Sequence, residues 1–177
     1  MGNIELNVSD TMRYSRHDHM NDLQLLLMYL DMGKYKEARK CILDKTAEMQ
    51  QLAMLQKLCM PLTEEWLTTL DWRYPVFKSH LHCDIASKIE VQQIDEVLVD
   101  YLERLVQDVI PKIDQYAECQ VEITVRTDAA GWSIQMTFSE IHAKQMNISE
   151  NSSLLTVEVC AEEGQWTFII SGQLGGN

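Results

Sequence analysis

Residues 15–35, SRHDHMNDLQLLLMYLDMGKY, place a polar cluster at the head of a leucine-rich segment that ends in a glycine turn. The apolar side chains of this segment recur at steps of three and four residues, which predicts an amphipathic helix with one buried stripe. They are Met20, Leu23, Leu27 and Leu30. The helical pattern spans about residues 3–31, and Gly33 is a typical stop signal.

A second helical pattern begins at Tyr35 and lasts to about residue 60. Because the connection is so short, the two helices are expected to fold back as an antiparallel hairpin. Each helix would be roughly 40 Å long, and a lone hairpin of that length cannot bury both apolar faces. Pairing with a second copy solves this, so the sequence predicts a dimeric four-helix bundle. Docking of the hairpin on the C-terminal half of its own chain is the alternative.

The periodicity changes after Pro61, and residues 61–72 predict a short helix with Thr63 as its candidate N-cap. Strand and helix patterns then alternate along the rest of the chain. The expected elements are a strand at residues 76–85, a helix at residues 94–118, and hairpins at residues 119–141 and 153–172. We therefore predict an α+β protein with a helical hairpin at residues 1–60 and, at residues 61–177, an antiparallel sheet covered by one long helix.

Composition excludes several classes of function. The chain has 27 acidic and 15 basic residues and a formal charge of -12, which opposes binding to nucleic acid or to anionic lipid. The N-terminal segment has no signal-peptide pattern, and no window approaches 18 uninterrupted apolar residues, so we expect a cytoplasmic protein without a membrane segment. Five scattered cysteines without a CxxC motif predict neither disulfides nor a zinc site.

The polar cluster divides between two sides of the first helix. At about 100° per residue, His17 lies on one shoulder of the predicted bundle, and Arg13, Asn21 and Gln24 lie along the same flank. His19 lies on the other shoulder, closer to the core. Because side chains at i and i+2 diverge on a helix, the two histidines are not expected to share a metal ion.

Two interpretations of His17 remain open at this point. A histidine on a helix shoulder is often only part of a solvated face. Alternatively, a neutral imidazole is a competent nucleophile for a phosphoryl group, and Asp18 can accept a hydrogen bond from one ring nitrogen while the other stays free. Asn21 can orient the incoming group, and Arg13 and Arg16 provide positive charge for a phosphoryl group in transfer.

The motif His17-Asp18-x-x-Asn21 resembles the phosphoacceptor helix of two-component histidine kinases. Ser15-Arg16-His17-Asp18, Met20-Asn21, Leu23-Gln24-Leu25 and the turn Gly33-Lys34-Tyr35 are more closely similar to the sporulation initiation phosphotransferase B family. Trp66-Leu67 and Asp71-Trp72 extend the resemblance over the first 75 residues, and beyond them only the order of elements agrees.

This resemblance implies a cytoplasmic homodimer in the phosphorelay that starts sporulation. His17 would take a phosphoryl group from the aspartate of a single-domain response regulator and pass it to the aspartate of a response-regulator transcription factor. Asp18 and Asn21 would assist the transfer, while Arg16 and Gln24, with Arg13 on the same flank, would bind the regulators. Magnesium is expected on the regulator, and no cofactor or metal on this chain.

The resemblance also implies a C-terminal domain similar to the ATPase domain of histidine kinases. That domain binds magnesium-ATP through asparagines on its long helix and through glycine-rich loops. Here Arg104 and Asp108 replace the asparagines, Pro111 interrupts the helix, and Gly131 is solitary. We therefore expect a degenerate domain that does not bind ATP. An ATP-dependent histidine kinase and a non-catalytic dimerisation module remain the alternative functions.

Overall fold

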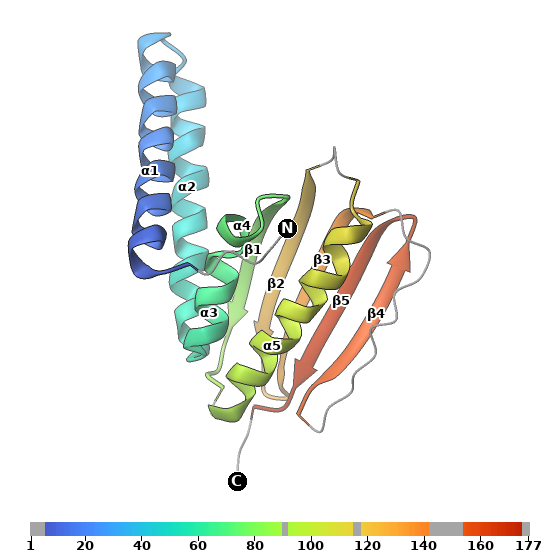
Figure 1. The fold of residues 1–177 in the computed structure, drawn as a ribbon. Helices are drawn as coiled ribbons and strands as arrows, with labels where there is room; N and C mark the ends of the chain where they lie inside the picture. The colour runs from blue at the N-terminus through green and yellow to red at the C-terminus, as the bar shows by residue number, and fades with distance from the viewer. Residues whose placement is uncertain (1–5, 90–91, 115–117, 142–153, 175–177) are drawn as a thin grey trace. The chain divides into compact units, whose positions relative to one another are not determined.

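The computed structural model describes residues 6–89, 92–114, 118–141 and 154–174. The chain forms two compact units, Met1–Gln51 and Leu52–Asn177. The first is a helical hairpin and the second is a five-stranded sheet with helices (Figure 1). The predicted α+β class, with the hairpin preceding the sheet, is confirmed.

The first unit consists of helix α1, Val8–Asp31, and most of helix α2, Tyr35–Leu55, which lie side by side in Figure 1. Asn7 caps α1, because its side-chain oxygen accepts a hydrogen bond from the backbone N–H of Asp10 at 3.0 Å. The cap explains why α1 begins later than the sequence pattern suggests; residues 3–5 lie outside the described residues. Gly33 closes the turn with a φ of 69°, a conformation that favours glycine.

Helix α2 ends earlier than expected. It gives way at Leu55 to the 3₁₀ helix η1, Gln56–Leu58, and Cys59 then takes a left-handed conformation with a φ of 60°. Leu55, Leu58 and Met60 are buried in the core of the second unit. The segment after Gln51 therefore packs with the C-terminal half of the chain.

The described elements of the second unit surround a mixed sheet. They are α3 (Pro61–Thr68), α4 (Leu70–Arg73), β1 (Phe77–Ile85), α5 (Gln92–Val109), η2 (Ile110–Lys112), β2 (Cys119–Thr127), β3 (Trp132–Ile141), β4 (Thr156–Glu162) and β5 (Gly164–Gly172). The strand order is β1-β2-β3-β5-β4. The expectation of a purely antiparallel sheet is wrong for one pair, since β1 and β2 run parallel. A parallel pair needs a crossover, and α5 lies on the crossover between these two strands.

The core of the second unit lies between α5 and one face of the sheet (Figure 1). Strands β2 and β3 alternate buried and exposed side chains, and the buried set faces the helix. Phe77, Phe138 and Phe168 pack in a row across three strands, with ring centroids 5.6 and 5.8 Å apart. This core makes the sheet a rigid base for α3 and α5.

Two local predictions in this unit are corrected. Thr63 is not the N-cap of α3, because Pro61 begins the helix and Thr63 lies inside it. The carboxylate of Asp95 in α5 instead accepts hydrogen bonds from the N–H groups of Leu62 and Thr63 at 2.9 and 2.8 Å.

The long helix also ends sooner than predicted. Helix α5 stops at Val109, and the next residues form the 3₁₀ turn of η2 around Pro111. Proline has no N–H for the helical ladder and its ring clashes with the preceding turn. Residues 115–117 of the predicted helix lie outside the described residues.

Candidate functional site

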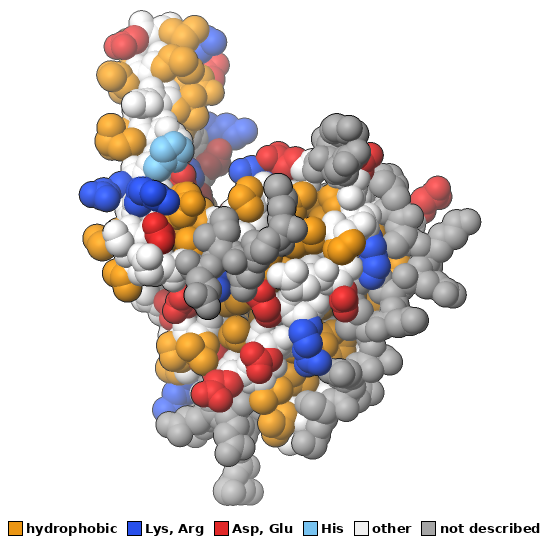
Figure 2. All heavy atoms as spheres, viewed as in Figure 1, with side chains coloured by type: hydrophobic (Ala, Val, Ile, Leu, Met, Phe, Trp, Pro, Cys, Tyr) orange, Lys and Arg blue, Asp and Glu red, His pale blue; other side chains and the backbone are white. Residues whose placement is uncertain are grey.

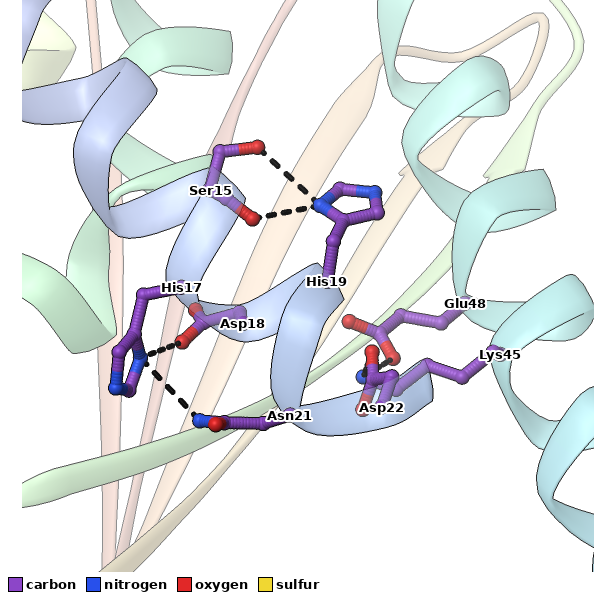
Figure 3. A network of polar contacts seen from close by, with 8 residues as sticks. All are labelled: Ser15, His17, Asp18, His19, Asn21, Asp22, Lys45 and Glu48. Atoms are coloured by element: carbon purple, nitrogen blue, oxygen red, sulfur yellow. Dashed lines mark hydrogen bonds and ion pairs between the residues drawn. The ribbon is translucent and has the colours of Figure 1, made fainter. Parts of the chain in front are cut away.

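His17 lies on the exposed surface of α1, and 69% of its side chain is accessible in the single chain. It sits in the middle of a regular helix whose backbone is fixed by the Asn7 cap at one end and the Gly33 turn at the other. The imidazole points away from the helix axis in Figure 3. The site therefore combines a rigid backbone with a side chain that a visiting protein can reach.

Two neighbours contact the same ring nitrogen of His17 (Figure 3). The Asp18 carboxylate oxygen Oδ1 lies 3.2 Å from Nδ1, and the Asn21 amide nitrogen Nδ2 lies 3.3 Å from the same atom. An ionised carboxylate can only accept, so the contact with Asp18 requires a proton on Nδ1. The amide N–H of Asn21 can donate to Nδ1 only when that nitrogen carries no proton, so the two contacts correspond to different tautomers of the ring.

The contact with Asp18 determines which ring nitrogen keeps its lone pair. When Nδ1 carries the proton, Nε2 of a neutral imidazole holds the lone pair. Among the described residues no hydrogen bond reaches Nε2, and that side of the ring faces solvent. His17 thus presents an accessible Nε2, while Asp18 and Asn21 lie against Nδ1.

Basic side chains gather on part of the hairpin face shown in Figure 2, with acidic side chains close by. Arg13 lies on the same helix as His17, 65% exposed, with its guanidinium 3.4 Å from Asp10 and above the ring of Tyr14. Arg16 is exposed and has no ion pair within the part of the chain that is described. Gln24 is exposed further along α1. These side chains are available to a partner, and neither Arg16 nor Gln24 contacts the His17 ring.

His19 points to the opposite side of α1 from His17 (Figure 3). Its Nδ1 lies 2.6 Å from the backbone oxygen of Ser15, one turn earlier. The two histidines are therefore held in different directions by separate contacts. No cluster of three or more His, Cys, Asp or Glu side chains suited to a metal ion is found in the described residues.

One feature of the site that the sequence analysis missed is an ionic link between the helices. Lys45 of α2 lies 3.1 Å from Asp22 of α1 and 2.9 Å from Glu48 of its own helix. Partial burial alone would lower the pKa of Lys45, but the hydrogen bonds and charges of Glu48 and Asp22 outweigh it and raise the pKa above its usual value. No spacing rule reveals this link, because Asp22 and Lys45 meet only after the hairpin has formed.

The residues expected to replace the kinase asparagines lie on α5. Arg104 and Asp108 are exposed on α5, and the Arg104 Nε donates to the backbone oxygen of Asp100 at 3.3 Å. Gly131 serves a packing role, since a Cβ at this position would lie 2.5 Å from the backbone oxygen of Gly172. A residue without a Cβ is required there because the chain just before β3 closely approaches the end of β5.

Among the described residues, no helix is a candidate for spanning a membrane. The helices found there are too short or too polar to cross a bilayer.

Comparison with known proteins places the hairpin in a family. Residues 3–58 match the family model described as Sensor_kinase_SpoOB-type, alpha-helical domain. The match spans both helices of the hairpin and includes His17. This part of the chain is a SpoOB-type helical domain, and the resemblance deduced from the sequence is confirmed for it. The match supports a two-component signalling protein with a function related to phosphotransfer.

Solved structures of histidine kinases are distantly similar to the chain. AdeS of Acinetobacter baumannii is 12% identical, with 90% of this chain and 98% of that one covered, at a TM-score of 0.41. ThkA in complex with the response regulator TrrA is 11% identical, with 95% and 62% covered, at a TM-score of 0.45. A blue-light activated histidine kinase of Erythrobacter litoralis is 9% identical, with 98% and 63% covered, at 0.46. No curated protein sequence matches the chain.

Proposed function

We propose that the chain is a phosphorelay histidine phosphotransferase that carries a phosphoryl group between response-regulator aspartates on His17, in the control of sporulation initiation. The observation that carries the proposal is the geometry of His17, whose Nδ1 is engaged by Asp18 and Asn21 while Nε2 faces solvent. The SpoOB-type hairpin supports the same class of function.

The transfer is a substitution at phosphorus in each direction. The Nε2 lone pair of His17 attacks the phosphorus of a regulator aspartyl phosphate; the N–P bond forms, and the O–P bond breaks with its electrons returning to the aspartate carboxylate. The ring becomes positively charged, and the carboxylate of Asp18 beside Nδ1–H stabilises that charge. A second regulator aspartate then attacks the phosphohistidine and restores the neutral ring.

Binding of the regulators is assigned to the exposed flank around His17. Arg13, Arg16 and Gln24 are exposed on α1 and can contact a partner, and the two guanidinium groups favour a negatively charged phosphoryl group. The magnesium that assists the reaction belongs to the regulator in this proposal. A single-domain regulator is the donor, and a response-regulator transcription factor is the acceptor.

The hairpin is proposed to act as a homodimer in a four-helix bundle, with residues 1–60 as the dimerisation and phosphoacceptor domain and residues 61–177 as a domain without ATP binding. In the single chain α1 has no buried residue, and Leu23 and Leu27 are 60% and 58% exposed. A stripe of large apolar side chains on a long helix is stabilised when a second hairpin covers it. Each dimer would present two His17 sites.

A two-regulator transfer assay tests this function. The donor regulator, carrying a radioactive aspartyl phosphate, is incubated with the protein and then with the acceptor regulator, in the absence of ATP. We expect label on the protein and then on the acceptor, no label on a His17→Ala variant, and normal transfer by a His19→Ala variant. Label retained by His17→Ala refutes the assignment.

Two further arms of the assay address the alternatives. Label acquired from ATP in the absence of any regulator indicates an ATP-dependent histidine kinase. Absence of transfer by the native protein, together with an intact dimer, indicates a non-catalytic dimerisation module.

A further inference from the structure

The second unit contains a groove between α3 and α5 that the proposed phosphotransfer does not use. Its cavity volume is about 280 Å³. Its accessible apolar lining comes from Leu62, which is 44% exposed, and from the half-buried Val99, while Trp66 lies almost fully buried beneath them. The indole N–H of Trp66 donates to Glu103 at 2.9 Å, so this polar group of the tryptophan is already satisfied. The lining therefore offers apolar surface to whatever enters.

The rim of the groove is negatively charged. Glu65, Glu96 and Asp100 line it together with a single cation, Arg73. Arg73 is already neutralised, because its guanidinium lies 3.2 Å from Glu65 and its Nε donates to Thr69 at 2.8 Å. Glu96 and Asp100 have no ion pair within the described part of the chain.

Glu96 and Asp100 also repel one another. They stand four residues apart on α5, and like charges at this spacing destabilise a helix by about 0.2–0.5 kcal/mol. A cation placed between them removes this repulsion. The two carboxylates therefore form an arrangement that a positively charged side chain completes.

The residues around the groove also favour a positively charged partner. Residues 52–177 contain 19 of the 27 acidic residues and only 8 of the 15 basic ones. Acidic side chains are prominent over α3 and α5 on the face shown in Figure 2. The negative electrostatic potential of these acidic side chains attracts cationic groups and repels phosphates and other anions.

We propose that the groove is a docking site for a basic segment of a partner protein. The aliphatic stem of a Lys or Arg lies on Leu62 and Val99, while its charged head lies between Glu96 and Asp100. An apolar residue beside that Lys or Arg covers the exposed part of Leu62. The site gives the second unit a role in recognition that is separate from the chemistry at His17.

Fluorescence anisotropy with the full chain tests the proposal, using a fluorescein-labelled peptide of alternating lysine and leucine as the probe. A Glu96→Gln, Asp100→Asn double variant is compared with a Glu158→Gln, Glu162→Gln double variant on β4, where both carboxylates are exposed. Both variants lose the same net charge. We expect about a tenfold weaker Kd for the groove variant and little change for the control. Equal weakening of both variants, or no binding by the native chain, overturns the proposal.

A second measurement locates the probe. Backbone amide NMR spectra of the full chain, recorded as the same peptide is added, are expected to shift for residues of α3 and α5. Replacement of Leu62 by Ser is expected to weaken binding several-fold even at high salt, where charge is screened. Shifts confined to another face contradict the assignment.

Discussion

The carboxylate of Asp18 lies 3.2 Å from Nδ1 of His17, the residue that precedes it in the chain. Adjacent side chains on a helix normally point in different directions, so this contact depends on the rotamers that both residues adopt. As a hydrogen bond, this contact requires the imidazole proton on Nδ1 and leaves Nε2 available. In the proposed transfer, the reactivity of His17 therefore depends on Asp18 as well as on the histidine itself.

Replacing Asp18 by Asn is expected to slow phosphotransfer about 10- to 100-fold. The amide can still accept a hydrogen bond from Nδ1–H, but it lacks the charge that stabilises the ring cation formed during transfer, and hydrogen bonds to charged groups are worth about 1.5–3 kcal/mol. Single-turnover transfer from the phosphorylated donor regulator measures the rate. Asp31→Asn, at the far end of α1, is the matched control and should transfer at the native rate; a native rate for Asp18→Asn contradicts the role given to this carboxylate.

Introducing a charge into the exposed leucine stripe is expected to prevent dimer formation. Leu27→Glu places two carboxylates against each other in the proposed bundle, and burying unpaired charge is costly. Met28→Glu, on a neighbouring side chain that is also about half exposed, is the control. Light scattering after size exclusion should give a monomer for the first variant and a dimer for the second. A dimeric Leu27→Glu variant argues against the proposed interface.

Loss of the Asp95 carboxylate is expected to destabilise the second unit by about 2 kcal/mol, since it satisfies two helix N–H groups and the Thr63 hydroxyl in a buried position. Asp95→Asn turns one acceptor oxygen into a donor and leaves one of these groups unpaired. Urea unfolding followed by tryptophan fluorescence measures the free energy of unfolding. Asp84→Asn, at an exposed position on β1, should change it by less than about 0.5 kcal/mol.

The cysteines are expected to react with thiol reagents in two classes. Burial raises the pKa of Cys83 and of Cys119 to about 11, so both stay neutral at pH 8, where thiolate is the reactive form. Cys59 and Cys160 are exposed and should be labelled first. Mass spectrometry of briefly alkylated native protein measures the order, and early modification of Cys119 contradicts the packing of β2.

The thiols of Cys83 and Cys119 also make the free energy of unfolding depend on pH. Because their folded pKa values lie above the ordinary value, the fold disfavours their ionised forms. Their contribution to stability is complete below about pH 9 and is lost as the pH rises toward 11. Urea midpoints should therefore fall over this interval, and less so in a Cys83→Ala, Cys119→Ala variant.

The hairpin could be predicted from the sequence because the residues that determine it are close together along the chain. The apolar residues from Met20 to Leu30 recur at intervals of three and four residues and so define one face of a helix. Gly33 supplies the positive φ that the turn requires. The grouping of His17 with Asp18 and Asn21 could also be predicted, since Asp18 and Asn21 lie one and four positions after His17 on one helix.

The parts that could not be predicted depend on contacts distant in sequence. The parallel pairing of β1 with β2 follows from the crossover through α5, which no single strand pattern reveals. Asp95 caps α3 from 32 residues away and takes the role that the local pattern gave to Thr63. The link from Asp22 to Lys45 is equally invisible before the two helices meet.

The most direct test of the central claim identifies the atom that carries the phosphoryl group. Protein with 15N-labelled histidine is incubated with the phosphorylated donor regulator, and long-range 1H–15N spectra with 31P coupling are recorded on the product. The account predicts a phosphorus coupling at Nε2 of His17 and none at the other four histidines. Coupling at Nδ1 of His17, at another histidine, or at no histidine contradicts it.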